Sequence, residues 1–184
     1  MHRIMSLFIL PLIGVGVLCF VPASPAKEFL TDKEIEAIQD AQAIDLRVRI
    51  YMEAAELRLK TAEDRLTGKE SSPGDPLEFF TPEDMVDAYY HILSGVMTSL
   101  DAAFQKAGRD RQKVTEALKS LKASTERAGK QLEVLKRLAE EKKKEDLWNL
   151  VNQAIGIARG AFEGAEEGLS RPVESPSQKS PKSR

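Results

Sequence analysis

The stretch VTEALKSLKASTERAGKQLEVLKRLA (114–139) decides the fold of this chain. Apolar and small residues recur in it at alternating steps of four and three, and charged residues fill most of the positions between them. The repeating set is Val114, Leu118, Leu121, Thr125, Ala128, Leu132, Leu135 and Ala139. This heptad spacing predicts one long helix over about 110–143, with an apolar face that packs against other helices.

Two segments before this stretch show the same kind of periodicity. Residues 45–67 have a broad apolar face, and Gly68 after them is typical of a helix C-terminus. Residues 82–107 also carry a heptad repeat, and Gly108 follows them. The members of that repeat are Val86, Tyr90, Leu93, Met97, Leu100 and Phe104. Both segments are therefore predicted to be long helices.

Two helix starts are marked by capping motifs. Thr31 is followed three residues later by Glu34, and Leu30 is placed to pack against Ile35. This motif predicts a short helix over 32–43. At the second start Thr81 precedes Pro82, a residue favoured in the first turn, and Phe80 is placed like Leu30.

The heptad phase is lost after Ala139, which predicts a break between Glu141 and Asp146 and a separate helix over 146–168. The fold expected from these elements is all-α: an up-and-down bundle of four long helices, with the short helix packed across one end. Because the connections are short, neighbouring helices are expected to be antiparallel. One domain, 27–169, holds the bundle.

The last helix contains the most unusual local pattern in the chain. Glycines recur in it every four residues, at Gly156, Gly160, Gly164 and Gly168. Each glycine inside a helix costs about 0.5–1 kcal/mol relative to alanine, so a compensating gain is expected. Two gains fit: close packing against a helix of the bundle, or a groove that receives a helix of a partner.

The first 26 residues are interpreted as a secretory signal peptide. His2 and Arg3 precede an apolar stretch from Leu7 to Val21, and small residues end at Ala26. Cleavage there leaves a mature chain of 158 residues without cysteine. The stretch is shorter than the roughly 20 residues of a membrane span, although a retained anchor stays the alternative. The expected location is exported, either periplasmic or extracellular.

Charge narrows the range of partners. Without the leader and the tail from Arg171, the chain has 22 basic and 28 acidic residues, a net charge of −6. Nucleic acid is therefore not expected as a partner, because its phosphates require a basic surface. Residues 170–184 are rich in Ser, Pro, Lys and Arg, and we expect a disordered basic tail with at most weak contact to an anionic surface.

Few residues offer chemistry. His91, with Asp87 four residues earlier, is the single histidine after the leader, so paired metal-binding histidines cannot form, and no haem-binding motif is present. We therefore predict no catalytic residue, no cofactor and no metal. Glu70-Ser71 is similar to the Glu-Ser pair of lytic transglycosylases, but the residues after it, Ser-Pro-Gly-Asp-Pro, depart from the Gly-rich motif of that family.

Residues 29–66, with the Ala41-Gln42 pair and Tyr51 four residues before Ala55, resemble the opening of exported helical proteins of bacteria. This resemblance implies no activity. The expected function is a non-enzymatic envelope protein that acts through protein or surface interactions, by a protein partner or by self-association. Two alternatives remain: a cell-wall or lipid hydrolase with Glu70 or an inward carboxylate as acid, and a carrier of a small ligand between the helices.

Overall fold

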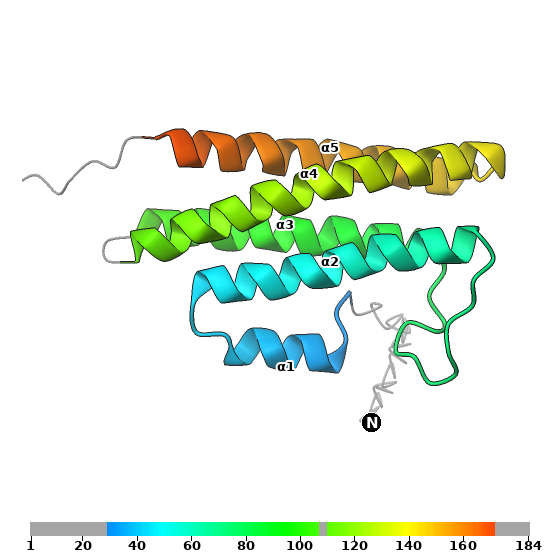
Figure 1. Ribbon diagram of the computed structural model, residues 1–184, viewed down its shortest axis with the longest axis horizontal. Coiled ribbons are helices and arrows are strands. Elements are labelled where there is room, and N and C mark those ends of the chain that lie inside the picture. Colours follow the sequence, from blue (N-terminus) through cyan, green and yellow to red (C-terminus); the bar gives the residue numbers. More distant parts are fainter. Residues whose placement is uncertain (1–28, 107–109, 172–184) are drawn as a thin grey trace, which may run out of the picture.

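The computed structural model describes residues 29–106 and 110–171, and its regular elements are five α-helices (Figure 1). The short helix α1 is followed by four long helices, as the sequence predicted. Their bounds are α1 Asp32–Asp40, α2 Ile44–Leu66, α3 Pro82–Lys106, α4 Arg111–Glu141 and α5 Glu145–Ser170. The all-α bundle is confirmed.

The four long helices form a square in which α2 and α5 occupy opposite corners. α2 packs against α3 and α4, and α5 packs against the same two helices, whereas α3 and α4 lie across the diagonal and touch little. The chain direction alternates along the sequence, so the adjacent pairs α2/α4 and α3/α5 are parallel (Figure 1). Long helices that are consecutive in the chain are antiparallel, as predicted, and the parallel pairs are formed by helices that are not consecutive.

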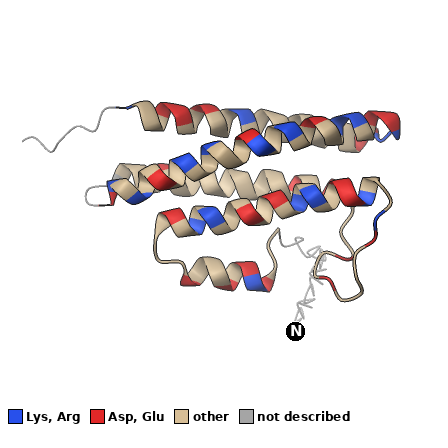
Figure 2. Cartoon of the chain, in the orientation of Figure 1, with Lys and Arg blue, Asp and Glu red and all other residues tan. Residues whose placement is uncertain are grey.

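The heptad residues of α4 lie in the core. All eight residues of the repeat, from Val114 to Ala139, are buried, and most of them belong to one continuous apolar cluster with residues of the other long helices. The outer face of α4 carries both signs of charge in alternation, with pairs such as Lys119–Glu116 (Figure 2). The apolar face of α4 is thus covered within the bundle.

The predicted apolar repeat of α3 is partly wrong. Tyr90 and Phe104, two of its members, are 36% and 41% exposed, whereas Tyr89 and Val96 are fully buried outside the repeat. The reason is that α3 packs against both α2 and α5, so its buried face is wider than a two-helix heptad contact and is centred nearer Tyr89.

The predicted caps and breaks are confirmed. Thr31 and Thr81 each cap a helix, and the Oγ1 atoms accept hydrogen bonds from the backbone N–H of Glu34 (3.3 Å) and Asp84 (3.1 Å). After α2, Gly68 has φ +85, and the backbone N–H of Lys69 donates to the carbonyl of Asp64, which is a Schellman ending.

The break between α4 and α5 lies where the heptad phase was lost. Lys143 holds a positive φ of 56, and the backbone N–H of Lys144 donates to the carbonyl of Ala139. No glycine marks this turn in the sequence, so the loss of apolar phase was the signal that located it.

The position of α1 differs from the prediction. It lies along the side of α2 and not across one end of the bundle (Figure 1). No residue of α1 itself is buried, because the helix contacts the bundle on one side only. What holds α1 there is a set of polar and aromatic contacts around its first turn.

Several predictions fall outside the described residues: the signal peptide 1–26, Gly108, and the tail beyond Arg171. Ser170, predicted to begin the tail, is instead the last residue of α5. None of the helices described has the length and apolar character needed to cross a membrane.

Candidate functional site

The glycines of α5 lie mostly on its exposed face. A methyl group added at Gly156, Gly160 or Gly164 would meet no atom of a neighbouring element within 4 Å. Only Gly168 lies close to another helix, where an added Cβ would stand 3.0 Å from Cδ1 of Leu118. Packing within the bundle therefore does not explain the first three glycines.

Alanines provide the close packing of α5 instead. Ala154, Ala158, Ala161 and Ala165 are buried and follow heptad steps of four, three and four. The glycines, at steps of four throughout, drift about 40° per step around a helix of 3.6 residues per turn. The series therefore begins on the exposed side and reaches the neighbouring helix only at Gly168. A partner groove at these glycines stays a prediction.

The residues considered for catalysis do not come together. Glu70 is exposed in the loop between α2 and α3. His91 is 44% exposed on α3, with its Nε2 atom 3.6 Å from Oδ1 of Asp87. Within 29–106 and 110–171, no group of three or more potential metal ligands gathers at one place.

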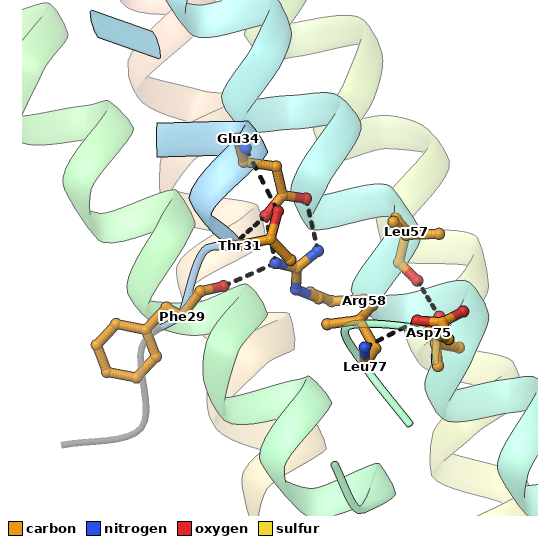
Figure 3. A network of polar contacts seen from close by, with 8 residues as sticks. Phe29, Thr31, Glu34, Leu57, Arg58, Asp75 and Leu77 are labelled. Carbon is orange, nitrogen blue, oxygen red and sulfur yellow. Dashed lines mark hydrogen bonds and ion pairs between the residues drawn. The ribbon is translucent and has the colours of Figure 1, made fainter. Parts of the chain in front are cut away.

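A buried arginine joins α2 to the start of α1 through several hydrogen bonds. Arg58 of α2 is 1% exposed, and its Nη1 and Nη2 atoms donate to Oε1 (2.8 Å) and Oε2 (2.6 Å) of Glu34. Nη2 also donates to the carbonyl oxygen of Phe29 (2.9 Å). Figure 3 shows the guanidinium between these two partners. Arg58 thus fastens α1 and the segment before it to α2.

Glu34 is also part of the α1 cap. Its Oε2 atom accepts a hydrogen bond of 2.7 Å from the backbone N–H of Thr31, which completes the capping box. Burial alone would raise the pKa of Glu34, but the hydrogen bonds from Arg58 and Thr31 and the charge of Arg58 outweigh it and lower that pKa. Glu34 is therefore a firmly ionised carboxylate, which is unsuited to act as a general acid.

Phe29 links the same segment to α3. Its ring stacks on the imidazole of His91, with ring centroids 4.1 Å apart and planes inclined by 22°. The ring of Tyr90 contacts the imidazole of His91 edge-on, with ring centroids 5.6 Å apart. His91 thus provides a stacking surface for the segment before α1, a role that the sequence did not indicate.

A cavity of about 390 Å³ lies between the start of α1 and the loop that precedes α3. Leu30, Pro76, Leu77 and Phe80 form its apolar lining, and Arg58 and Lys33 are among its polar lining residues. A cavity of this size falls within the range of ligand pockets. A second cavity of about 320 Å³, near Arg47 and Lys113 at the other end of α2, has more polar walls.

The loop between α2 and α3 is held from within. Nη2 of Arg65 donates to Oγ of Ser71 (2.8 Å) and to the carbonyl oxygens of Leu77 (2.7 Å) and Glu78 (2.9 Å). The backbone N–H of Gly74, a residue with φ +84, donates to Oε2 of Glu78 (2.9 Å). These bonds give the loop a defined conformation.

One large apolar side chain of this loop is exposed to solvent. Phe79 is 85% exposed, although Leu77 two residues earlier is buried and Phe80 next to it packs against the core. The other large apolar side chains that are exposed in the described chain have exposed fractions between 36% and 46%. Phe79 is therefore an isolated and strongly exposed aromatic ring on a fixed loop.

Sequence reasoning missed both Arg58 and Phe79, although each left a signal. Arg58 lies three residues after Ala55 and four before Ala62, so it falls on the apolar face of α2. A charged side chain that is buried on such a face requires a partner. Phe79 precedes Phe80, the residue directly before the helix cap Thr81. The capping motif uses only one apolar residue at that position, which is Phe80. The second phenylalanine had no structural role in the predicted fold.

No protein family, no curated protein and no solved structure matches this chain.

Proposed function

We propose that this protein is an exported, non-enzymatic helical bundle of the bacterial envelope that acts by protein contact through the loop 67–81. The observation that carries the proposal is the exposure of Phe79 on a loop whose backbone is held by Arg65. Aromatic rings are prominent among the residues that dominate binding energy at protein interfaces. A ring held on a fixed backbone loses little conformational entropy on binding.

The loop also has a charge that suits a protein partner better than an anionic membrane. Glu70, Asp75 and Glu78 accompany Lys69 within it, so the surface around Phe79 is net acidic. An anionic lipid surface would repel these carboxylates, whereas a partner with an apolar pocket and a basic rim would attract them. For the basic tail we propose, at most, a weak contact with an anionic surface.

The two alternative functions have less support. A hydrolase needs a carboxylic acid with a raised pKa in a cleft, but Glu70 is exposed on a loop and Arg58 lowers the pKa of Glu34. A carrier of an apolar ligand needs an apolar space between the long helices, but the cavity of about 390 Å³ lies beside α1, and the cavity of about 320 Å³ at the end of the bundle, where α2 and α4 begin, has more polar walls.

Export is proposed from the leader sequence and has its own test. Amino-terminal sequencing of the protein recovered from the envelope should begin at Lys27. A sequence beginning at Met1, in a protein that remains with the membrane, would support the retained anchor.

Photo-crosslinking tests the proposed contact. The photoreactive residue p-benzoylphenylalanine replaces Phe79 in one variant and Leu46 in a control, since Leu46 is 45% exposed near the far end of α2. In cells that export the protein, irradiation should give one discrete protein adduct from position 79 and much less from position 46. Equal or absent adducts at the two positions would contradict the proposal.

A further inference from the structure

The first residues that the structure describes are attached to the bundle on two sides. The carbonyl oxygen of Phe29 accepts a hydrogen bond of 2.9 Å from Nη2 of Arg58 in α2 (Figure 3). The ring of Phe29 stacks on the imidazole of His91 in α3, with ring centroids 4.1 Å apart. Leu30, the next residue, packs against the apolar core. The chain is therefore held by α2 and α3 from Phe29 onward.

Releasing this segment has a high cost. Arg58 is 1% exposed, and its guanidinium also donates to both carboxylate oxygens of Glu34 in the first turn of α1. Withdrawing Phe29 breaks a charge-assisted hydrogen bond and an aromatic stacking contact. Withdrawing the first turn of α1 as well leaves a buried cation without its partners. The segment is therefore free of the bundle in only a small fraction of the folded molecules.

The bond that the proposed export requires to be cut lies close to this attachment. Only Lys27 and Glu28 separate Ala26 from Phe29 in the sequence. The steps from Ala26 to Phe29 span at most about 11 Å, even for a fully extended chain. As long as Phe29 is attached, the bond after Ala26 is thus within about one helix diameter of the bundle.

A peptidase needs more room around the bond that it cuts. Its active site is a cleft, and a peptide bound to a protein in extended form gives up its other backbone contacts. The backbone carbonyl of Phe29, close after the bond, is already bound to Arg58. A folded bundle at this distance also collides with the walls of the cleft. Cleavage after Ala26 and attachment of Phe29 therefore exclude each other.

We propose that the attachment of Phe29 sets the order of maturation: the leader is removed before this segment binds to α2 and α3, and a precursor that folds first keeps its leader. The step is hydrolysis by a signal peptidase. Water adds across the bond between Ala26 and Lys27, which gives Ala26 a carboxylate and Lys27 the new α-amino group. This inference rests on the proposed export and adds when the cut is made.

Cleavage of the full-length precursor by a purified signal peptidase in nonionic detergent tests this order. The precursor is recovered from cells in which export is blocked, and circular dichroism verifies that it is folded. A second precursor carries a flexible linker of about twelve Gly and Ser residues between Glu28 and Phe29, which moves the bond away from an unchanged bundle. The folded wild type should be cut at least about thirtyfold more slowly than the linker precursor.

A reference without a bundle corrects for the preference of the peptidase. The linker changes the sequence shortly after the bond, so each cleavage rate is divided by that of the matching peptide. These peptides cover residues 1–36, with and without the linker, and contain α1 without the helices to which it attaches. The normalised rates then differ only through the folded bundle.

Two substitutions far along the chain from the bond weaken the attachment itself. His91→Ala removes the stacking surface of Phe29 and should raise the cleavage rate of the folded precursor by about threefold to tenfold. His91→Phe keeps an aromatic ring there and should retain the wild-type rate. Arg58→Met removes the donor to the Phe29 carbonyl and should raise the rate further, whereas Arg49→Met, on the exposed side of α2, should not change it. Because His91 is exposed, its result stands even if Arg58→Met folds poorly.

Three results would overturn the inference. If the folded wild type and the linker precursor have equal normalised rates, or if neither His91→Ala nor Arg58→Met changes the rate, the attachment does not protect the bond. In both cases the proposed export stands and only the order is wrong. If neither the precursors nor the peptides are cut after Ala26, the leader is not removed there, and the inference and the proposed export fail together.

Discussion

Nη2 of Arg58 lies 2.6 Å from Oε2 of Glu34, and the arginine side chain is 1% exposed while the glutamate side chain is 16% exposed. The pair joins α2 to the first turn of α1, a helix that has no buried residue of its own. Because α1 has little apolar contact, this ion pair and the Phe29–His91 stacking decide whether the helix stays on the bundle.

Replacing Arg58 should therefore destabilise the protein strongly. Arg58→Met leaves the half-buried Glu34 carboxylate and the Phe29 carbonyl without their donor, which should lower the free energy of unfolding by about 2–3 kcal/mol. Arg49→Met, on the exposed side of the same helix, should change it by less than about 0.5 kcal/mol. Urea unfolding followed by circular dichroism measures both.

The double variant Arg58→Met/Glu34→Leu provides the check on this explanation. It removes both charges together, so it should recover at least half of the loss. A double variant that is less stable than the sum of the two single changes would mean that the ion pair is not the cause.

The same pair predicts a pH dependence. The pKa of Glu34 is lower in the folded protein than in the unfolded chain, where a glutamate has a pKa of about 4.3. The ionised Glu34 carboxylate therefore stabilises the folded protein fully above the pKa of the unfolded chain. This stabilisation is lost as the pH falls through the lower pKa of the folded protein. The difference in unfolding free energy between the wild type and Glu34→Gln should be constant near neutral pH and should shrink below about pH 4. A difference that is unchanged at pH 3 would contradict the lowered pKa.

The glycines of α5 should be replaceable with a gain in stability. Alanine at Gly156, Gly160 or Gly164 meets open space, and each substitution should raise the free energy of unfolding by about 0.5–1 kcal/mol. Gly168→Ala is the matched control, because its Cβ would press on Leu118 at 3.0 Å and should gain less or lose stability. Equal gains at all four positions in thermal unfolding would show that Gly168 is not in close contact.

Tyr89 offers a test of a buried hydroxyl. The side chain is fully buried in α3, and its hydroxyl has no hydrogen-bond partner among the residues that the structure describes. Burial, with the nearby charge of Glu56, raises the pKa of this phenol far above its ordinary value. Tyr89→Phe should leave the unfolding free energy unchanged or raise it by up to about 1 kcal/mol. Tyr90→Phe, on the 36% exposed neighbour, should change it by less than about 0.5 kcal/mol. A loss above about 1 kcal/mol at Tyr89 would reveal a partner for its hydroxyl.

Periodicity predicted the helices well because a helix that buries one face must repeat apolar residues at its own pitch. The repeat from Val114 to Ala139 is buried throughout, and the loss of phase after Ala139 located the turn at Lys143. Periodicity predicted α3 less well, since a helix between two neighbours buries a wider arc than a heptad marks, and Tyr89 fell outside the expected set.

The candidate site was harder to predict, because both of its principal residues depend on parts of the chain far away in sequence. Arg58 is stabilised by a carboxylate 24 residues earlier, and a charged residue on an apolar face does not state which partner it will find. The backbone just before Phe79 accepts hydrogen bonds from Arg65, a residue with no special pattern around it.

The sequence by itself determined that the chain forms helices, where most of them begin and end, and which face of α4 is buried, because these properties follow from local dihedral preferences, caps and apolar pitch. Only the tertiary structure decided that α3 and α4 are diagonal, that α1 lies along α2, that alanines and not glycines provide the packing of α5, and that Phe79 is exposed. These depend on which surfaces meet, and several arrangements of the same amphipathic helices bury similar apolar area.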